Sequence, residues 1–138
     1  MGISYVEFED EHGVLRRYRK HANGRGLVAT TAKVDPTAYV DPTAYVDPGA
    51  VVHRGASIGH GGWVESDAVV AERAVIGVNA HIGRGAVVGR AAVIGPYATV
   101  ESDAKVHNGA RVPRDTTVAH GSEFRPSSDD LRRLGLAA

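Results

Sequence analysis

The sequence contains no cysteine, one methionine, one tryptophan and two phenylalanines in 138 residues. Without cysteine the chain can form no disulfide, no cysteine-ligated zinc site and no thiol nucleophile. Sixteen basic and sixteen acidic residues cancel to a net charge of zero, which argues against a general nucleic-acid binder. No run of 18 apolar residues is present, and the N-terminus shows no secretory signal. We therefore expect a cytoplasmic protein that binds neither nucleic acid nor membrane.

Small and β-branched residues take the place of the missing large ones. Valine, alanine and glycine occur 20, 20 and 17 times, whereas leucine occurs five times. A helical or α/β domain normally fills its core with leucine and phenylalanine. This composition therefore predicts a β-structure whose core consists of valine, isoleucine and alanine.

A six-residue repeat dominates the chain. From Val28 to Val118 every sixth residue is valine or isoleucine, in 16 of 16 positions and without an insertion. The residue four places after each of these is alanine in 13 hexads. In ten hexads glycine, aspartate or asparagine, which tolerate a positive φ, stands three places after the aliphatic. Each hexad is therefore predicted to be a short strand and a turn, because a period of six does not fit a helix.

Three hexads complete one coil of 18 residues, so the 96 repeat residues form a little over five coils. At about 4.8 Å per coil, the resulting prism is about 25 Å long. The aliphatic side chains point inward and stack 18 residues apart, while the alanines occupy the corners. Pro48 and Gly49 suit the central positions of a type II turn at one of these corners.

This pattern resembles the bacterial hexapeptide-repeat proteins over residues 28–123, in repeats such as residues 34–39 (VDPTAY) and 82–87 (IGRGAV). The resemblance implies an all-β fold, the left-handed parallel β-helix, whose handedness departs from the usual right-handed crossover. We therefore expect three segments: an N-terminal hairpin and linker at 1–27, a β-helix of about five 18-residue coils at 28–123, and a C-terminal capping tail at 124–138.

The N-terminal segment reads as a hairpin over residues 3–20, with an acidic strand facing a basic one. A β-helix exposes unpaired strand edges at both ends, and we expect the hairpin to cover one of them. Cross-strand charge pairing is the simpler interpretation of the basic strand. The alternative is a partner-docking element made of Arg16, Arg17, Arg19 and Lys20.

The C-terminal tail carries the signals of a short helix. Ser127 or Ser128 is the expected N-cap, and Gly135 follows the last turn. Together with Phe124, this helix is expected to cover the other end of the coils.

The residue before each inward aliphatic points outward, and these residues sort by face. The valine face carries three valines between two lysines: Lys33, Val51, Val69, Val87 and Lys105. The aromatic face carries Leu27, Tyr45, Trp63, His81 and Thr99, which either stack on a ligand ring or, more simply, pack against a subunit. Outward valines can reflect β-propensity alone, but an apolar stripe rimmed by charge more often marks a contact surface. Because members of the resembled family are commonly trimers, we expect the three valines to form a homotrimer seam.

Seven histidines raise the question of a metal site. His53 and His107 share a column but lie three coils, about 14 Å, apart, too far to bind one metal within a chain. The γ-class carbonic anhydrases of the resembled family use two histidines five residues apart, but here Glu65 stands at that spacing after His60. We expect no metal site, and a carbonic anhydrase-like metalloenzyme is the least favoured function.

The acyltransferases of the resembled family use a histidine as general base between adjacent prisms. Such a base must lie within hydrogen-bond reach of the acceptor group. His53, His60 or His81 would reach a cleft between subunits, but nothing in the sequence singles out one of them. The acyltransferases also usually carry a long loop that walls the acyl-donor site, and the unbroken hexads leave no place for it.

We therefore expect a non-enzymatic homotrimer that serves as a structural or assembly module, with no catalytic, cofactor-binding or metal-binding residues and no cofactor. Its partner would be a larger protein assembly such as a capsid. A phage virion decoration or scaffolding protein is one concrete version, which would place the protein in the virion. The alternative is a CoA-dependent acyltransferase with an intersubunit active site, an argument from analogy.

The trimer prediction can be tested on the valine face. Val69→Asp places a charge in the middle of the apolar stripe and is expected to dissociate the trimer, because an unpaired carboxylate is costly to bury. Light scattering measures the mass of both proteins. A wild-type mass near that of one 14.5 kDa chain would refute the trimer.

Overall fold

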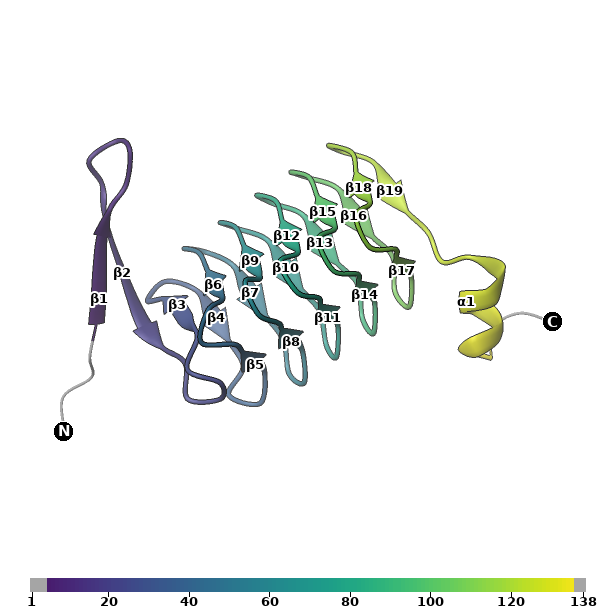
Figure 1. Ribbon diagram of the computed structural model, residues 1–138, viewed down its shortest axis with the longest axis horizontal. Helices are drawn as coiled ribbons and strands as arrows, with labels where there is room; N and C mark the ends of the chain where they lie inside the picture. Colours follow the sequence, from purple (N-terminus) through teal and green to yellow (C-terminus); the bar gives the residue numbers. More distant parts are fainter. Residues whose placement is uncertain (1–4, 136–138) are drawn as a thin grey trace.

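Each hexad of the repeat forms a strand of two or three residues, in which the inward aliphatic follows an outward residue. The computed structural model, which describes residues 5–135, stacks these strands into three sheets, A, B and C, around a common core (Figure 1). Within each sheet, repeat strands 18 residues apart are parallel neighbours. The predicted all-β fold is confirmed: a parallel β-helix of about five coils with an N-terminal hairpin and a short C-terminal helix.

Sheet A has eight strands, of which the hairpin supplies the first two: β1 (Tyr5–Glu9), β2 (Leu15–Lys20), β3 (Leu27–Ala29), β6 (Tyr45–Val46), β9 (Trp63–Val64), β12 (His81–Ile82), β15 (Thr99–Val100) and β18 (Thr117–Val118). Sheet B has six: β4 (Lys33–Val34), β7 (Val51–Val52), β10 (Val69–Val70), β13 (Val87–Val88), β16 (Lys105–Val106) and β19 (Glu123–Phe124). Sheet C has five: β5 (Tyr39–Val40), β8 (Ser57–Ile58), β11 (Val75–Ile76), β14 (Val93–Ile94) and β17 (Arg111–Val112). The one helix in residues 5–135, α1 (Ser128–Arg133), is too short to cross a membrane. Residues 1–4 and 136–138, parts of the two predicted terminal segments, lie outside the described residues.

The core is the column of inward aliphatics that the repeat predicts. All of these side chains are buried except Val34, and the corner alanines are buried as well. Val34 is half-buried because β4 is the edge strand of sheet B, so no further strand covers it. The core is therefore one continuous stack from the first coil to the last.

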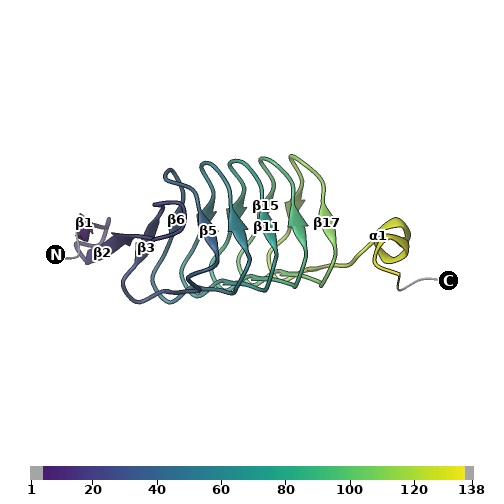
Figure 2. The same cartoon turned by 90° about the horizontal axis from the view of Figure 1, so that it is seen from below.

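The terminal segments lie at the two ends of the stack (Figures 1 and 2). Strand β2 pairs antiparallel with β3, so the hairpin extends sheet A beyond the first coil. At the other end Ser127 is the N-cap of α1, and the Asp130 carboxylate accepts a hydrogen bond of 2.8 Å from Nε of Arg111 on β17. Phe124 packs against the end of the core. The hairpin and the helix thus occupy the positions expected of caps.

The turns depart from the sequence prediction at three corners. A positive φ recurs at every sixth residue from Gly49 to Gly121, in thirteen hexads instead of the predicted ten. Gly49 has a φ of 79°, as the type II turn predicted there requires. The additional positions hold Arg73, Ala91 and Tyr97, whose side chains disfavour this conformation. The coil imposes the left-handed turn on them at a cost of about 1–2 kcal/mol each.

The strain at these corners can be measured by replacing Ala91 with glycine. We expect Ala91→Gly to raise the free energy of unfolding by about 0.5–1 kcal/mol, because the relieved strain exceeds the extra chain entropy of glycine. Ala92→Gly is the matched control: it removes a buried methyl group from an ordinary backbone position and should destabilise the protein. Urea denaturation compares both variants with the wild type. A lower free energy of unfolding in Ala91→Gly than in the wild type would contradict the proposed backbone strain at Ala91.

Candidate functional site

The outer side of sheet A carries the strongest candidate site. Tyr45, Trp63 and His81 lie one above another on β6, β9 and β12, as predicted for the aromatic face. The rings of Trp63 and His81 are stacked, with centroids 4.5 Å apart and planes 11° from parallel. The imidazole of His81 is therefore held in one orientation on a rigid strand.

A carboxylate fixes the second contact of His81. Its Nε2 is hydrogen-bonded to Oε2 of Glu65, which lies on the preceding coil. Because an ionised carboxylate only accepts hydrogen bonds, the neutral imidazole carries its proton on Nε2 and keeps a lone pair on Nδ1. No hydrogen bond joins Nδ1 to any of the residues 5–135, and 33% of the His81 side chain is exposed. This is the arrangement of a general base oriented by a carboxylate.

The pair results from a diagonal relation between neighbouring coils. The residue after each inward aliphatic also points outward, and it lies beside the outward residue 16 positions later, on the next coil. Three pairs with this spacing are hydrogen-bonded: Asp47 with Trp63, Glu65 with His81, and His107 with Glu123. A search of the sequence at a spacing of 16, in addition to 18, would have identified Glu65 as the partner of His81.

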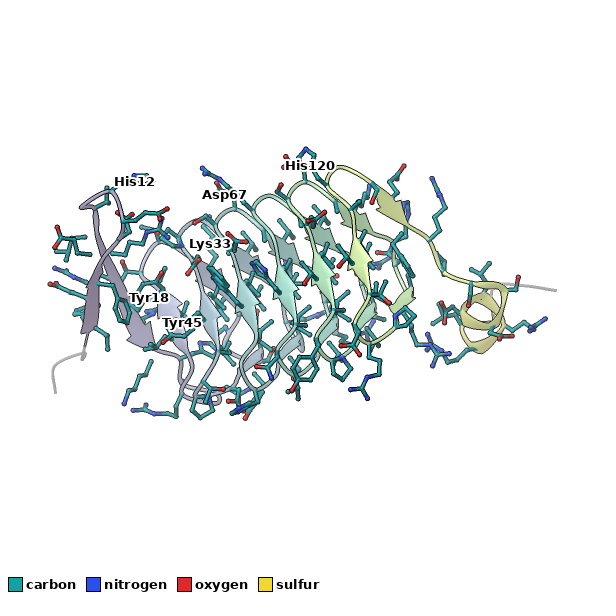
Figure 3. The ribbon with its side chains drawn as sticks, turned by 45° about the horizontal axis from the view of Figure 1, so that its top comes forward. His12, Tyr18, Lys33, Tyr45, Asp67 and His120 are labelled. Carbon is teal, nitrogen blue, oxygen red and sulfur yellow. The ribbon has the colours of Figure 1, made fainter. Side chains whose placement is uncertain are left out.

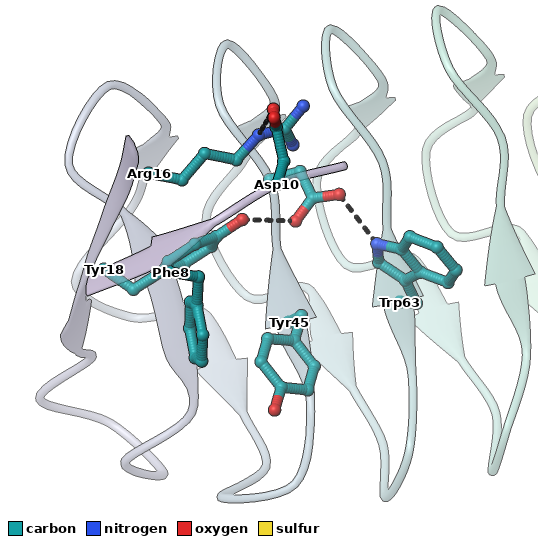
Figure 4. Close-up of a pocket in the computed structure, with 7 residues that line it drawn as sticks. Phe8, Asp10, Arg16, Tyr18, Tyr45 and Trp63 are labelled. Carbon is teal, nitrogen blue, oxygen red and sulfur yellow. Dashed lines mark hydrogen bonds and ion pairs between the residues drawn. The ribbon is translucent and has the colours of Figure 1, made fainter. Parts of the chain in front are cut away.

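A pocket of about 410 Å³ lies beside Trp63, between the hairpin and the outer side of sheet A (Figure 4). Tyr18 on β2 and Tyr45 on β6 meet there at the hairpin end of the molecule, with ring centroids 6.3 Å apart (Figure 3). The full lining is Phe8, Asp10, Arg16, Tyr18, Tyr45, Asp47 and Trp63. The hairpin therefore walls this pocket. From the sequence the hairpin was predicted to be an end cap or a partner-docking element, and the pocket was not predicted.

Asp47 ties the hairpin to the coils within this pocket. Its Oδ1 accepts a hydrogen bond of 2.8 Å from the Tyr18 hydroxyl, and its Oδ2 accepts one of 2.7 Å from Nε1 of Trp63. Both Asp47 and Tyr18 are buried. Burial first, and then the hydrogen bond to Asp47, raises the pKa of Tyr18 to about 12. The phenol therefore remains protonated at neutral pH and acts as a hydrogen-bond donor.

The remaining histidines lack this combination of contacts. His53 approaches Glu72 at 3.5 Å, and His60 contacts the Thr43 hydroxyl at 3.1 Å. Within the described part of the chain, His81 is the one histidine stacked on an aromatic ring. It is thus the one that stands out among the three histidines considered from the sequence. In residues 5–135 no three His, Asp or Glu side chains are arranged to hold a metal ion.

The predicted valine stripe exists as a surface. Val51, Val69 and Val87 lie in register on β7, β10 and β13, and all three are half-buried. Lys33 and Lys105 flank them on β4 and β16. A single chain does not test the trimer seam, which stays a prediction.

The basic strand of the hairpin engages in cross-strand charge pairing. Arg17 forms an ion pair with Glu7 at 2.9 Å, and Arg16 forms one with Asp10 at 3.2 Å. Successive residues of a strand point to opposite faces. The predicted docking set is therefore divided between two faces of β2, with Arg16 and Lys20 on one and Arg17 and Arg19 on the other. Docking of a partner by these residues stays a prediction.

No protein-family model matches this sequence, and no curated protein sequence matches it. Several solved structures share the fold. A serine acetyltransferase from Entamoeba histolytica, in complex with cysteine, is 17% identical with a TM-score of 0.51, over 60% of this chain and 34% of that one. A hexapeptide transferase family protein from Anaplasma phagocytophilum is 14% identical with a TM-score of 0.42, over 78% of this chain and 82% of that one.

A perosamine N-acetyltransferase variant from Caulobacter crescentus, in complex with CoA and GDP-perosamine, is 26% identical with a TM-score of 0.43. The match covers 63% of this chain and 50% of that one. This chain therefore spans about a third of the serine acetyltransferase and half of the perosamine enzyme. These similarities show the hexapeptide-repeat fold.

The prediction of a non-enzymatic structural or assembly module is wrong. The finding against it is the fold shared with the serine acetyltransferase, which is a transferase. The prediction was based on the absence of an active-site loop, on the outer apolar stripe and on the charged terminal segments. The hairpin walls a pocket without such a loop. The prediction also overlooked the diagonal contact that gives His81 its carboxylate partner.

The pKa of Tyr18 can be checked by ultraviolet titration of the phenol groups. One tyrosine should ionise near pH 12, and Tyr18→Phe should remove that step, whereas Tyr5→Phe, at an exposed site on β1, should preserve it. Because the pKa is higher in the folded state than in the unfolded one, the free energy of unfolding should fall as the pH rises from about 10 to about 12. A wild-type titration without a step near pH 12 would contradict the buried hydrogen bond.

Proposed function

We propose that this protein, which has the fold of the hexapeptide-repeat left-handed β-helix proteins, is a CoA-dependent acyltransferase with His81 as its general base. The observation that carries the proposal is the hydrogen-bonded pair of His81 and Glu65 on the open side of sheet A, beside a pocket. A general base needs a fixed orientation and a free nitrogen, and His81 has both. Its side chain is also partly exposed and stacks on Trp63, which lines the pocket. Among base-catalysed reactions, acyl transfer is the one that the resemblance to the hexapeptide-repeat family implies.

In this reaction His81 moves one proton. Nδ1 accepts it from the attacking amine or hydroxyl group as that group adds to the thioester carbonyl carbon of the acyl donor. The new C–N or C–O bond forms as the C–S bond breaks, and His81 passes the proton to the departing thiolate. The reaction needs no oxidant or reductant, because a thioester and an acceptor become an amide or ester and a free thiol.

Glu65 and Trp63 act as positioning residues. Glu65 accepts the hydrogen bond from Nε2, which keeps the free lone pair on Nδ1 and stabilises the imidazolium that forms. Trp63 restrains the plane of the ring by stacking on it. The proposed homotrimer seam lies on sheet B, a different side of the prism, so it leaves the outer side of sheet A available for substrate.

The role of His81 can be tested with acetyl-CoA and a set of primary amines and alcohols. His81→Asn is expected to lower kcat by about 10²–10⁴-fold, because the reaction loses its base. Glu65→Gln should lower kcat with little change in the KM for acetyl-CoA, since it alters the orientation and tautomer of the base. Release of the CoA thiol measures the rate.

His107→Asn is the matched control, because it breaks a His–Glu pair of the same spacing on sheet B. This variant should retain the wild-type rate. Saturating acetyl-CoA should also raise the Tm of the wild-type protein, as ligand linkage requires. The proposal fails if the His81 and His107 variants lose equal activity, or if the wild type neither releases thiol nor gains stability.

A further inference from the structure

The pocket under the hairpin presents an unusual amount of aromatic surface. Phe8, Tyr45 and Trp63 are 40%, 41% and 44% exposed and line the same hollow (Figure 4). Phe8 and Tyr18 meet edge to face, with centroids 5.4 Å apart and planes at 69°. Contiguous exposed apolar surface of this kind is typical of binding sites.

The charges around these rings leave a negative excess. Asp10 and Asp47 contribute two carboxylates and Arg16 one cation. The Arg16 guanidinium is charged at neutral pH, as arginine ordinarily is, and forms an ion pair with Asp10 at 3.2 Å. Arg16 therefore offsets one carboxylate. The two hydrogen-bond donors to Asp47 are the uncharged hydroxyl of Tyr18 and indole of Trp63. The hydrogen bonds of Asp47 are thus satisfied, but the pocket keeps one net negative charge.

We propose that this pocket binds the acyl acceptor, and that the acceptor is an organic amine that enters as its ammonium ion with an apolar or aromatic body. Aromatic faces and an unbalanced carboxylate both attract an organic cation. A volume of about 410 Å³ is in the range of small-molecule pockets. The inference rests on the proposed function, because it assigns the acceptor side of the same site. Trp63 joins the two parts, since it lines the pocket and stacks on His81.

The chemistry of the step is balanced with these groups. The bound ammonium first releases one proton to water, and the neutral amine then attacks the thioester carbonyl carbon of the acyl-CoA. As the C–N bond forms and the C–S bond breaks, His81 takes a second proton from the nitrogen and gives it to the CoA thiolate. The product is an uncharged amide. The amide lacks the positive charge that attracted the ammonium ion to the pocket, and this difference favours release of the amide.

The fluorescence of Trp63 reports directly on the pocket, because Trp63 is the single tryptophan of the chain. The probes are phenethylammonium chloride and the neutral phenethyl alcohol, which has nearly the same shape. We expect the ammonium ion to bind about tenfold more tightly than the alcohol. Tyr45→Leu, which removes an exposed ring and leaves the core intact, should weaken ammonium binding by about 3- to 10-fold.

Asp47→Asn should remove the preference for the ammonium ion over the alcohol, since it removes the unbalanced charge. Asp103→Asn, at an exposed acidic corner outside the pocket, is the control and should bind both probes like the wild type. Equal wild-type affinity for the two probes would overturn the inference. So would unchanged ammonium binding in Tyr45→Leu, or displacement of the ammonium ion by free CoA, which would identify the pocket as the acyl-donor site.

Acetyl transfer separates this inference from the proposed function. If acetyl-CoA acetylates phenethylamine and not phenethyl alcohol, the acceptor assignment is supported. If the ammonium ion binds selectively but is not acetylated, while other acceptors are, the acceptor assignment is wrong and the acyltransferase stands. If the wild type releases no thiol with any acceptor, the proposed function itself fails, whatever the fluorescence shows.

Discussion

Backbone hydrogen bonds between neighbouring coils hold the hexads in an 18-residue register, as the bond of 3.0 Å from the His81 amide to the Ala98 carbonyl illustrates. This register decides which aliphatics stack in the core and also which side chains meet outside it. Outward residues 18 apart lie directly above one another, and those 16 apart lie diagonally. Trp63 and His81 meet by the first relation, Glu65 and His81 by the second. One inserted residue between the coils would reverse the faces and separate all three side chains.

A regular stack of coils has flat sides, and a flat side encloses no ligand. This chain keeps its hexads unbroken from residue 28 to residue 123, so concavity can arise only where the repeat ends or where two prisms meet. The hairpin provides the first of these. It continues sheet A through β2 and is held to the coils by the bond between Tyr18 and Asp47. A side chain that anchors a cap thereby also forms part of a pocket.

The fold was predictable because the repeat leaves few alternatives: sixteen inward aliphatics without a gap determine the strands, the coil length and the faces. The left-handed turns at Arg73 and Tyr97 were not predictable, because the coil geometry imposes a positive φ that these residue types disfavour. The contact between Glu65 and His81 could have been predicted from the sequence, because the two residues have the diagonal spacing of 16. The pocket could not have been predicted from the sequence. The hairpin is held over sheet A by the hydrogen bond between Tyr18 and Asp47, which are 29 residues apart, and no local sequence pattern encodes this contact.

The function was misjudged for a related physical reason. The absence of a long loop excludes a binding site only if nothing else can form its wall. Here the two strands of the hairpin form the wall of a pocket. Trp63 shows how closely the two roles are joined: its indole nitrogen donates to Asp47, which anchors the hairpin, and its ring stacks on His81. Removing the hairpin anchor would therefore disturb the orientation of His81 as well as the shape of the pocket. A contact that closes the end of the β-helix and a contact that orients the proposed base share one side chain, so the stability of this end of the molecule and the geometry of His81 are coupled.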